Sequence, residues 1–296
     1  MPEPLIEQAE LVVAHLGQDL VQRGNHCGYL LWRAVPPDGL EFVSVGPRSP
    51  ACRRLAPGGL DDLERLARSD VVGSCAVLDR SEDGSIVVVH VLPEAPKARD
   101  QQVAGVGLSL DPAGCGDGWA VTWSDTGLMT VVLVDGLGHG PLAGAGADAV
   151  LGVLTAGYDG TPEDFVRRAN AAAITTRGGA LGWCSIDPVR GVMHFAGVGN
   201  IAGRIYLPDR THGLTSRPGS VGISQTPPRI RRSSHPWTPG AAVVLHTDGV
   251  RVMYGAGPKL PRGGPLVLAA GLLRDHSRDD DDATVVVITD ARAQHP

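Results

Sequence analysis

The spacing of apolar and polar residues changes near residue 100, and the two regions predict different folds. Before that point, residues 7–22 place apolar side chains three and four positions apart, which predicts an amphipathic helix, and residues 60–67 predict a second helix. Apolar runs of strand length lie between turns at 28–35, 40–45, 75–78 and 85–92. Residues 1–92 are therefore predicted to form an α/β two-layer domain.

Residues 93–102 are polar, contain two prolines and form the clearest predicted linker in the chain. Beyond the linker, successive hairpins predict a second domain at 103–291. Its predicted strands are 118–123, 130–135, 182–186, 192–197, 202–207, 213–216, 241–247 and 284–289, and its predicted helices are 141–154, 162–173 and 264–276. Antiparallel strands with helices grouped between them predict an α+β layered fold and argue against a parallel nucleotide-binding sheet.

Composition narrows the function classes further. The chain has 296 residues, 43% of them apolar, which is enough for a packed core. With a formal net charge of −6, the chain has no excess of positive charge with which to bind nucleic acid or an anionic membrane. The five cysteines form no CxxC pair, which is typical of reduced thiols and argues against a zinc cage. An acidic start and apolar runs of only strand length lead us to expect a soluble cytoplasmic protein without nucleic-acid or membrane partners.

Aspartates stand at the ends of several predicted strands. Asp117 begins one strand, Asp135 and Asp248 each end an apolar strand and precede a glycine, and Asp281 and Asp282 directly precede the last strand. Each of these aspartates alone is also compatible with an ordinary turn. Carboxylates gathered at one rim of a sheet repel one another unless cations neutralise them, and oxygen ligands of this kind suit magnesium or manganese.

Other chemistries fit the sequence less well. Residues 136–140 lack the GK[ST] of a P-loop and the spacing of a dinucleotide-binding turn, and no GxSxG motif of a serine hydrolase occurs. The basic stretch 229–232, followed by His235 and Trp237, is compatible either with a phosphoprotein contact or with a solvated strand edge.

Four motifs carry a resemblance to a known family. Residues 131–140 (VVLVDGLGHG), 195–204 (FAGVGNIAGR), 245–250 (LHTDGV) and 281–287 (DDATVVV) resemble the SpoIIE/RsbX-type branch of the PPM phosphatases, in order and spacing, over about residues 103–290. The resemblance implies an α-β-β-α sandwich with two antiparallel sheets between helical layers. It also implies a site for two manganese or magnesium ions and the hydrolysis of phosphoserine or phosphothreonine by an activated water.

The resemblance also implies roles for individual residues. Asp135 would bridge both ions, and Gly136 would offer its backbone carbonyl to one of them. The remaining candidate metal residues are Asp117, Asp248, Asp281 and, at the position after the last ligand, Asp282. His139 is a candidate proton donor or phosphate contact, and Asn200 is interpreted as a structural turn residue. No arginine dedicated to phosphate binding is recognisable in the sequence.

The first region is similar in its helix and strand order to a GHKL (histidine-kinase-like) ATPase domain. Asp19, Ser44 and residues 71–74 stand where that family has its magnesium-binding asparagine, its adenine-reading aspartate and its GxGLG loop. A degenerate domain that does not bind ATP and serves docking or regulation is therefore expected. The whole chain is interpreted as a phosphatase acting on a phosphorylated bacterial regulatory protein, such as an anti-sigma antagonist or a stressosome-type partner. The alternative is a catalytically silent phosphatase-like binding module.

Overall fold

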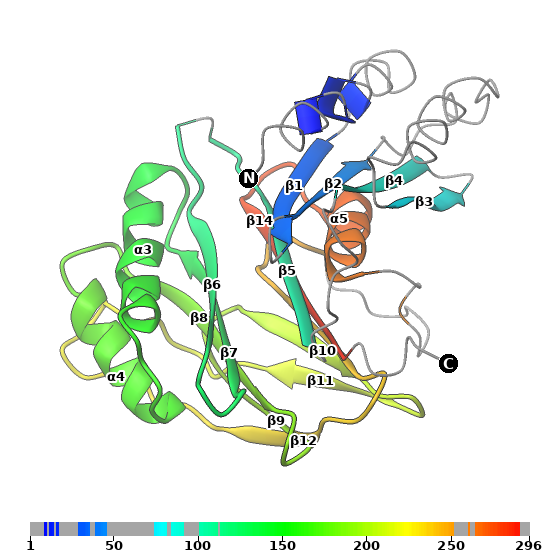
Figure 1. Cartoon of the computed structure of the whole chain (residues 1–296). Coiled ribbons are helices and arrows are strands. Elements are labelled where there is room, and N and C mark those ends of the chain that lie inside the picture. Colours follow the sequence, from blue (N-terminus) through cyan, green and yellow to red (C-terminus); the bar gives the residue numbers. More distant parts are fainter. Residues whose placement is uncertain are drawn as a thin grey trace. The chain divides into compact units, whose positions relative to one another are not determined.

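The computed structural model describes residues 9–10, 12–14, 16–17, 29–35, 39–45, 74–81, 84–91, 101–111, 113–251, 260 and 264–290. The chain divides into two compact units, Met1–Arg99 and Asp100–Pro296 (Figure 1). The division falls within the segment 93–102 that the sequence marks as a linker.

The first unit contains a four-stranded antiparallel sheet. Its strands are β1 (Tyr29–Val35), β2 (Gly39–Val45), β3 (Ser74–Ser81) and β4 (Gly84–Val91), in the order β1-β2-β4-β3. The described residues between 9 and 17 are helical, in agreement with the predicted helix at 7–22. Ser44 is buried in β2. The predicted helix at 60–67, Asp19 and residues 71–73 lie outside the described residues.

Two five-stranded antiparallel sheets form the centre of the second unit. One has the order β11-β10-β13-β14-β5 and the other the order β12-β9-β8-β7-β6. The strands are β5 (Gln101–Leu108), β6 (Asp117–Trp123), β7 (Met129–Gly136), β8 (Gly179–Asp187), β9 (Val192–Val198), β10 (Ala202–Tyr206), β11 (Thr211–Thr215), β12 (Ser233–Pro236), β13 (Ala242–His246) and β14 (Ala283–Asp290).

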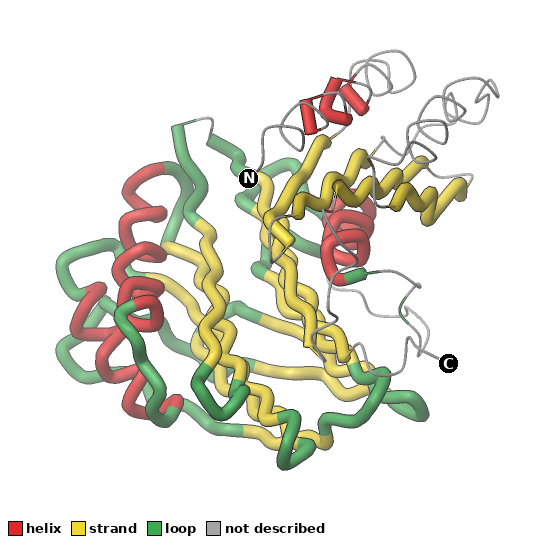
Figure 2. The backbone as a smooth tube through the Cα atoms, in the orientation of Figure 1, coloured by secondary structure: helices red, strands yellow, loops and turns green. Residues whose placement is uncertain are grey.

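Helices cover the outer faces of both sheets. Helix α3 (Pro141–Thr155) packs against β6 and β7 and against α4 (Pro162–Ala173), whereas α5 (Pro265–His276) packs against β5 and β14 (Figures 1 and 2). This arrangement is an α-β-β-α sandwich, so the predicted fold is confirmed. Helix α4 begins as predicted at the N-cap Thr161, whose hydroxyl accepts a hydrogen bond from the Asp164 amide.

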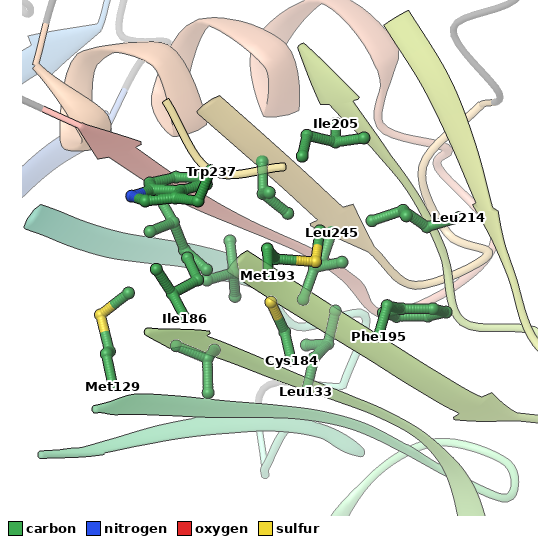
Figure 3. Packing of buried hydrophobic residues seen from close by; sticks show 14 of the residues in the cluster. Met129, Leu133, Cys184, Ile186, Met193, Phe195, Ile205, Leu214, Trp237 and Leu245 are labelled. Carbon is green, nitrogen blue, oxygen red and sulfur yellow. The ribbon is translucent and has the colours of Figure 1, made fainter. Parts of the chain in front are cut away.

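The main hydrophobic core lies between the two sheets. Met129, Leu133, Phe195 and Leu245 from both sheets meet there (Figure 3), and burial of each such side chain stabilises the fold by about 1.5–3 kcal/mol. Trp237 belongs to the same core and is only 2% exposed. It is therefore unavailable for the phosphoprotein contact considered above, whereas the arginines of residues 229–232 lie exposed before the edge strand β12.

Candidate metal centre

Strand pairing brings the first two candidate carboxylates together. Asp117 at the start of β6 lies opposite Asp135 near the end of β7 in the antiparallel register. From the other sheet, the Thr247 hydroxyl donates a 2.8 Å hydrogen bond to Asp117 Oδ2 and accepts one of 2.9 Å from the Thr284 amide. The end of β13 and the start of β14 are thus joined directly to β6, and both sheets contribute to one site.

Asn200 connects the second pair of carboxylates. Its side-chain Nδ2 donates to Asp135 Oδ2 at 3.0 Å and to Asp248 Oδ2 at 2.8 Å. The preceding residue, Gly199, has φ +87°, and a side chain there would overlap Ala180. The tight turn expected from the sequence is therefore present, but the sequence reading missed the contact of Asn200 with the site. The signal that could have revealed it is its position two residues after a buried strand, which it shares with Asp248.

Asp282 has a different environment from the other candidate ligands. It is 2% exposed, and its two oxygens accept 2.6 Å hydrogen bonds from the backbone N–H groups of Leu110 and Gly116. The sequence reading grouped Asp282 with the metal residues because it follows Asp281. These two hydrogen bonds hold the segment before β6 in place, and the role of Asp282 as a metal ligand stays a prediction.

Burial and mutual repulsion disfavour negative charge at Asp117, Asp135 and Asp281. Burial, with smaller contributions from Asp282 and Asp281, raises the pKa of Asp117 to about 7, and the Thr247 hydroxyl opposes this shift. Burial and the charges of Asp117 and Asp248 raise the pKa of Asp135 to about 8. The pKa of Asp281 is also raised, first by burial and then by the charge of Asp248. The structure therefore brings Asp117, Asp135, Asp248 and Asp281 into one interacting cluster.

The chemistry of this donor set fits a hard divalent cation. The four side chains offer only oxygen, and a cation would relieve the repulsion that raises these pKa values. In the described part of the chain, however, no three His, Cys, Asp or Glu side chains are already arranged around a common metal position. The present side-chain positions are held instead by the Asn200 amide and the Thr247 hydroxyl.

The glycine-rich segment after β7 packs closely against its surroundings. The Gly136 amide donates to the Gly116 carbonyl at 3.0 Å, and a Cβ on Gly136 would lie 2.2 Å from the Ala143 carbonyl oxygen of α3. Gly138 and Gly140 have φ values of +88° and +75°, which turn the chain from β7 into α3. His139 lies between them and is exposed, so its role as a proton donor or phosphate contact stays a prediction.

Gly136→Ala is expected to lower the free energy of unfolding by about 1–3 kcal/mol, because the new methyl group meets backbone atoms that cannot move aside easily. Gly152→Ala in α3 is the matched control: nothing lies within 4 Å of its added Cβ, and we expect a gain of up to about 1 kcal/mol. Urea unfolding of both variants measures the difference. Equal stability of the two variants would contradict the close packing at Gly136.

Comparison with known proteins agrees with the geometry of the second unit. Residues 125–251 match the family model described as Stage II sporulation protein E (SpoIIE). Phosphoserine phosphatase RsbX of Bacillus subtilis (strain 168) is 25% identical over 138 residues, which cover 47% of this chain and 68% of the relative.

Solved structures show the same fold. A structure of RsbX in complex with magnesium matches with a TM-score of 0.56 and 19% identity, over 66% of this chain and 98% of that one. A structure from work on the bacterial stressosome as a modular system matches with a TM-score of 0.58 and 22% identity, over 64% of this chain and all of that one. The second unit therefore has the fold of the PPM serine/threonine phosphatases and carries the SpoIIE sequence pattern over residues 125–251.

Proposed function

We propose that this protein is a divalent-metal-dependent phosphatase that hydrolyses phosphoserine or phosphothreonine in a protein. The observation that carries the proposal is the carboxylate cluster formed by Asp117, Asp135, Asp248 and Asp281 where the two sheets meet. Partly buried like charges with raised pKa values, as at Asp117 and Asp135, are costly to the fold, and cation binding would remove that cost.

The residues of the carboxylate cluster and their neighbours have separate proposed roles. Asp117, Asp135, Asp248 and Asp281, with the Gly136 carbonyl, would hold two Mg²⁺ or Mn²⁺ ions, and Asp282 would keep the segment before Asp117 in place. When bound, such ions supply Lewis-acid chemistry, lowering the pKa of a water and offsetting charge on the phosphoryl oxygens. Thr247 fixes the orientation of the Asp117 carboxylate. The exposed His139, four residues after Asp135, is the proposed proton donor to the leaving alkoxide.

Asn200→Ala is expected to lower the stability of the metal-free protein by about 1 kcal/mol and to enlarge the stabilisation by Mn²⁺, because the amide now holds the two carboxylates that the cation would take. Asn200→Asp adds a further negative charge, so both effects should be larger in that variant. Calorimetric unfolding in EDTA and in Mn²⁺ measures them. Unchanged unfolding of both variants under both conditions would exclude a role of Asn200 in the centre.

The substrate we propose is a phosphorylated bacterial regulatory protein, either an anti-sigma antagonist or a stressosome-type partner, in the cytoplasm. Support comes from two of the matches, which are a phosphoserine phosphatase and a structure from work on the bacterial stressosome. Within the described ranges, no helix is long and apolar enough to cross a membrane.

We also propose that residues 1–92 form a degenerate GHKL-like domain that serves docking or regulation without binding ATP. The full chain is therefore expected to have the same unfolding temperature with millimolar ATP and Mg²⁺ as with Mg²⁺ alone. Differential scanning fluorimetry with ATP, and with AMP as the matched nucleotide control, checks this. A specific upward shift with ATP would show that the nucleotide site has been retained.

The proposed reaction is tested with three sets of phosphopeptides, carrying phosphoserine, phosphothreonine or phosphotyrosine, in the presence of Mn²⁺. We expect phosphate release from the first two sets, loss of release in EDTA, and little release from phosphotyrosine. Cation binding without release from any set would instead favour the catalytically silent binding module. One observation favours this alternative: among the described residues, no three His, Cys, Asp or Glu side chains are already arranged around a common metal position.

A further inference from the structure

The loop before β8 runs beside the glycine-rich segment that follows β7. Strands β7 and β8 pair up to Gly136 opposite Gly179, and the Leu137 amide continues the pairing with a 3.0 Å hydrogen bond to the Gly178 carbonyl (Figure 1). The next residue of that loop, Arg177, therefore lies beside Gly138. A Cβ built on Gly138 would be only 3.0 Å from Arg177 Nη1.

Arg177 brings an available positive charge to this loop. Its side chain is exposed, and no carboxylate among the described residues forms an ion pair with it. Asp135 precedes Gly138 by three residues, so their Cα atoms are at most about 11 Å apart. The guanidinium therefore lies beside the loop that follows Asp135, and no carboxylate among the described residues is paired with it.

A positive side chain at this place would favour the binding of a phosphorylated substrate. The carboxylates repel a phosphate dianion and can only act on it through cations, whereas an arginine presents a planar fork that matches two phosphate oxygens. Gly138 leaves the space beside the guanidinium free, because it has no side chain. We propose that Arg177 binds the phosphate group of the substrate and orients it toward the carboxylate cluster, an inference that rests on the proposed phosphatase function.

The surroundings of the loop suit a polypeptide substrate. Ile223 is 59% exposed, and its Cδ1 would lie 3.3 Å from a Cβ on Gly178, the residue next to Arg177. A protein segment that covers Ile223 would exclude water from the arginine–phosphate pair and strengthen it. The sequence did not reveal Arg177 because a single arginine before two glycines is typical of an ordinary turn between a helix and a strand.

Arg177→Gln is the variant that tests the inference, and Arg190→Gln is its matched control. Arg190 is also an exposed arginine, but it lies in the turn at the other end of β8. With p-nitrophenyl phosphate and Mn²⁺, we expect Arg177→Gln to raise KM and the inhibition constant of inorganic phosphate by about tenfold or more, with a smaller change in kcat. Arg177→Lys should recover part of the loss, and Arg190→Gln should match the wild type.

Calorimetric titration of inorganic phosphate into the Mn²⁺-loaded protein separates this inference from the proposed function. Weaker phosphate binding in Arg177→Gln alone supports the role of Arg177, even if the wild type proves inactive as a phosphatase. Equal phosphate binding by the wild type and Arg177→Gln, or no binding by either, overturns it. An unchanged unfolding temperature of Arg177→Gln confirms that the comparison is between folded proteins.

Discussion

Asp135→Asn is expected to lower Mn²⁺-dependent phosphate release by about a thousandfold or more, equivalent to about 4 kcal/mol of transition-state stabilisation. Asp135 lies at the centre of the cluster, opposite Asp117 and joined to Asp248 through Asn200. An amide at this position keeps the shape of the side chain but loses the charge that would hold the cations. Asp125→Asn, at the exposed turn of the same hairpin, is the control that should retain full activity.

The same substitution should leave the metal-free fold intact and make it more stable at alkaline pH. The pKa of Asp135 is about 8 in the fold and near 4 in the unfolded chain, so the folded protein binds more protons between these values. At this site, stability is therefore lost as the pH rises from about 4 to 8, and asparagine avoids the loss. Urea unfolding in EDTA should show equal stability of wild type and variant near pH 4 and a more stable variant at pH 8.5. A variant that unfolds more easily at pH 8.5 would contradict the cost assigned to the buried charge.

Manganese is expected to stabilise the protein strongly at alkaline pH and weakly at acidic pH. The carboxylates must lose their protons before they bind a cation, and the pKa values of Asp117 and Asp135 are about 7 and 8. At a hundredfold excess over the dissociation constant, one bound ion contributes about 2.7 kcal/mol, which corresponds to an upward shift of about 5–10 °C for a domain of this size.

Differential scanning calorimetry at pH 5.5, 7.0 and 8.5 measures this dependence, with Ca²⁺ as a comparison cation and Asp135→Asn as the control. We expect the shift to grow across the three pH values in the wild type and to be much smaller in the variant. A shift of the same size at pH 5.5 and 8.5 would place the bound manganese elsewhere on the protein.

Most of the second unit could be predicted from the sequence because its strands are apolar and its turns contain Gly, Pro and Asp. Helix α4 was predicted with its observed ends, since Thr161 and Pro162 mark its start. Two edge strands were missed. β5 includes the polar pair Gln101 and Gln102, and β12 consists of two serines, a histidine and a proline, so neither has a strong alternating pattern.

Only those residues of the candidate site whose positions are set by strand ends could be predicted from the sequence. Aspartates at the ends of neighbouring strands come together because the sheets bring those ends to one edge, as found for Asp117 and Asp135. Asn200 and Arg177 lie in loops, and their positions depend on how the chain turns between elements. The role of Asp282 depends on two backbone amides that are more than 160 residues away in sequence, which no local pattern reveals.

The account is tested most directly by phosphate release from a phosphoserine-containing protein by the full chain, measured as Mn²⁺ is titrated from zero, with Asp135→Asn measured in parallel. We expect no release without the cation, saturable release with it, and no release from the variant at any concentration. Release that persists in EDTA, or that Asp135→Asn retains, would contradict the assignment of the carboxylate cluster as the metal-dependent catalytic centre.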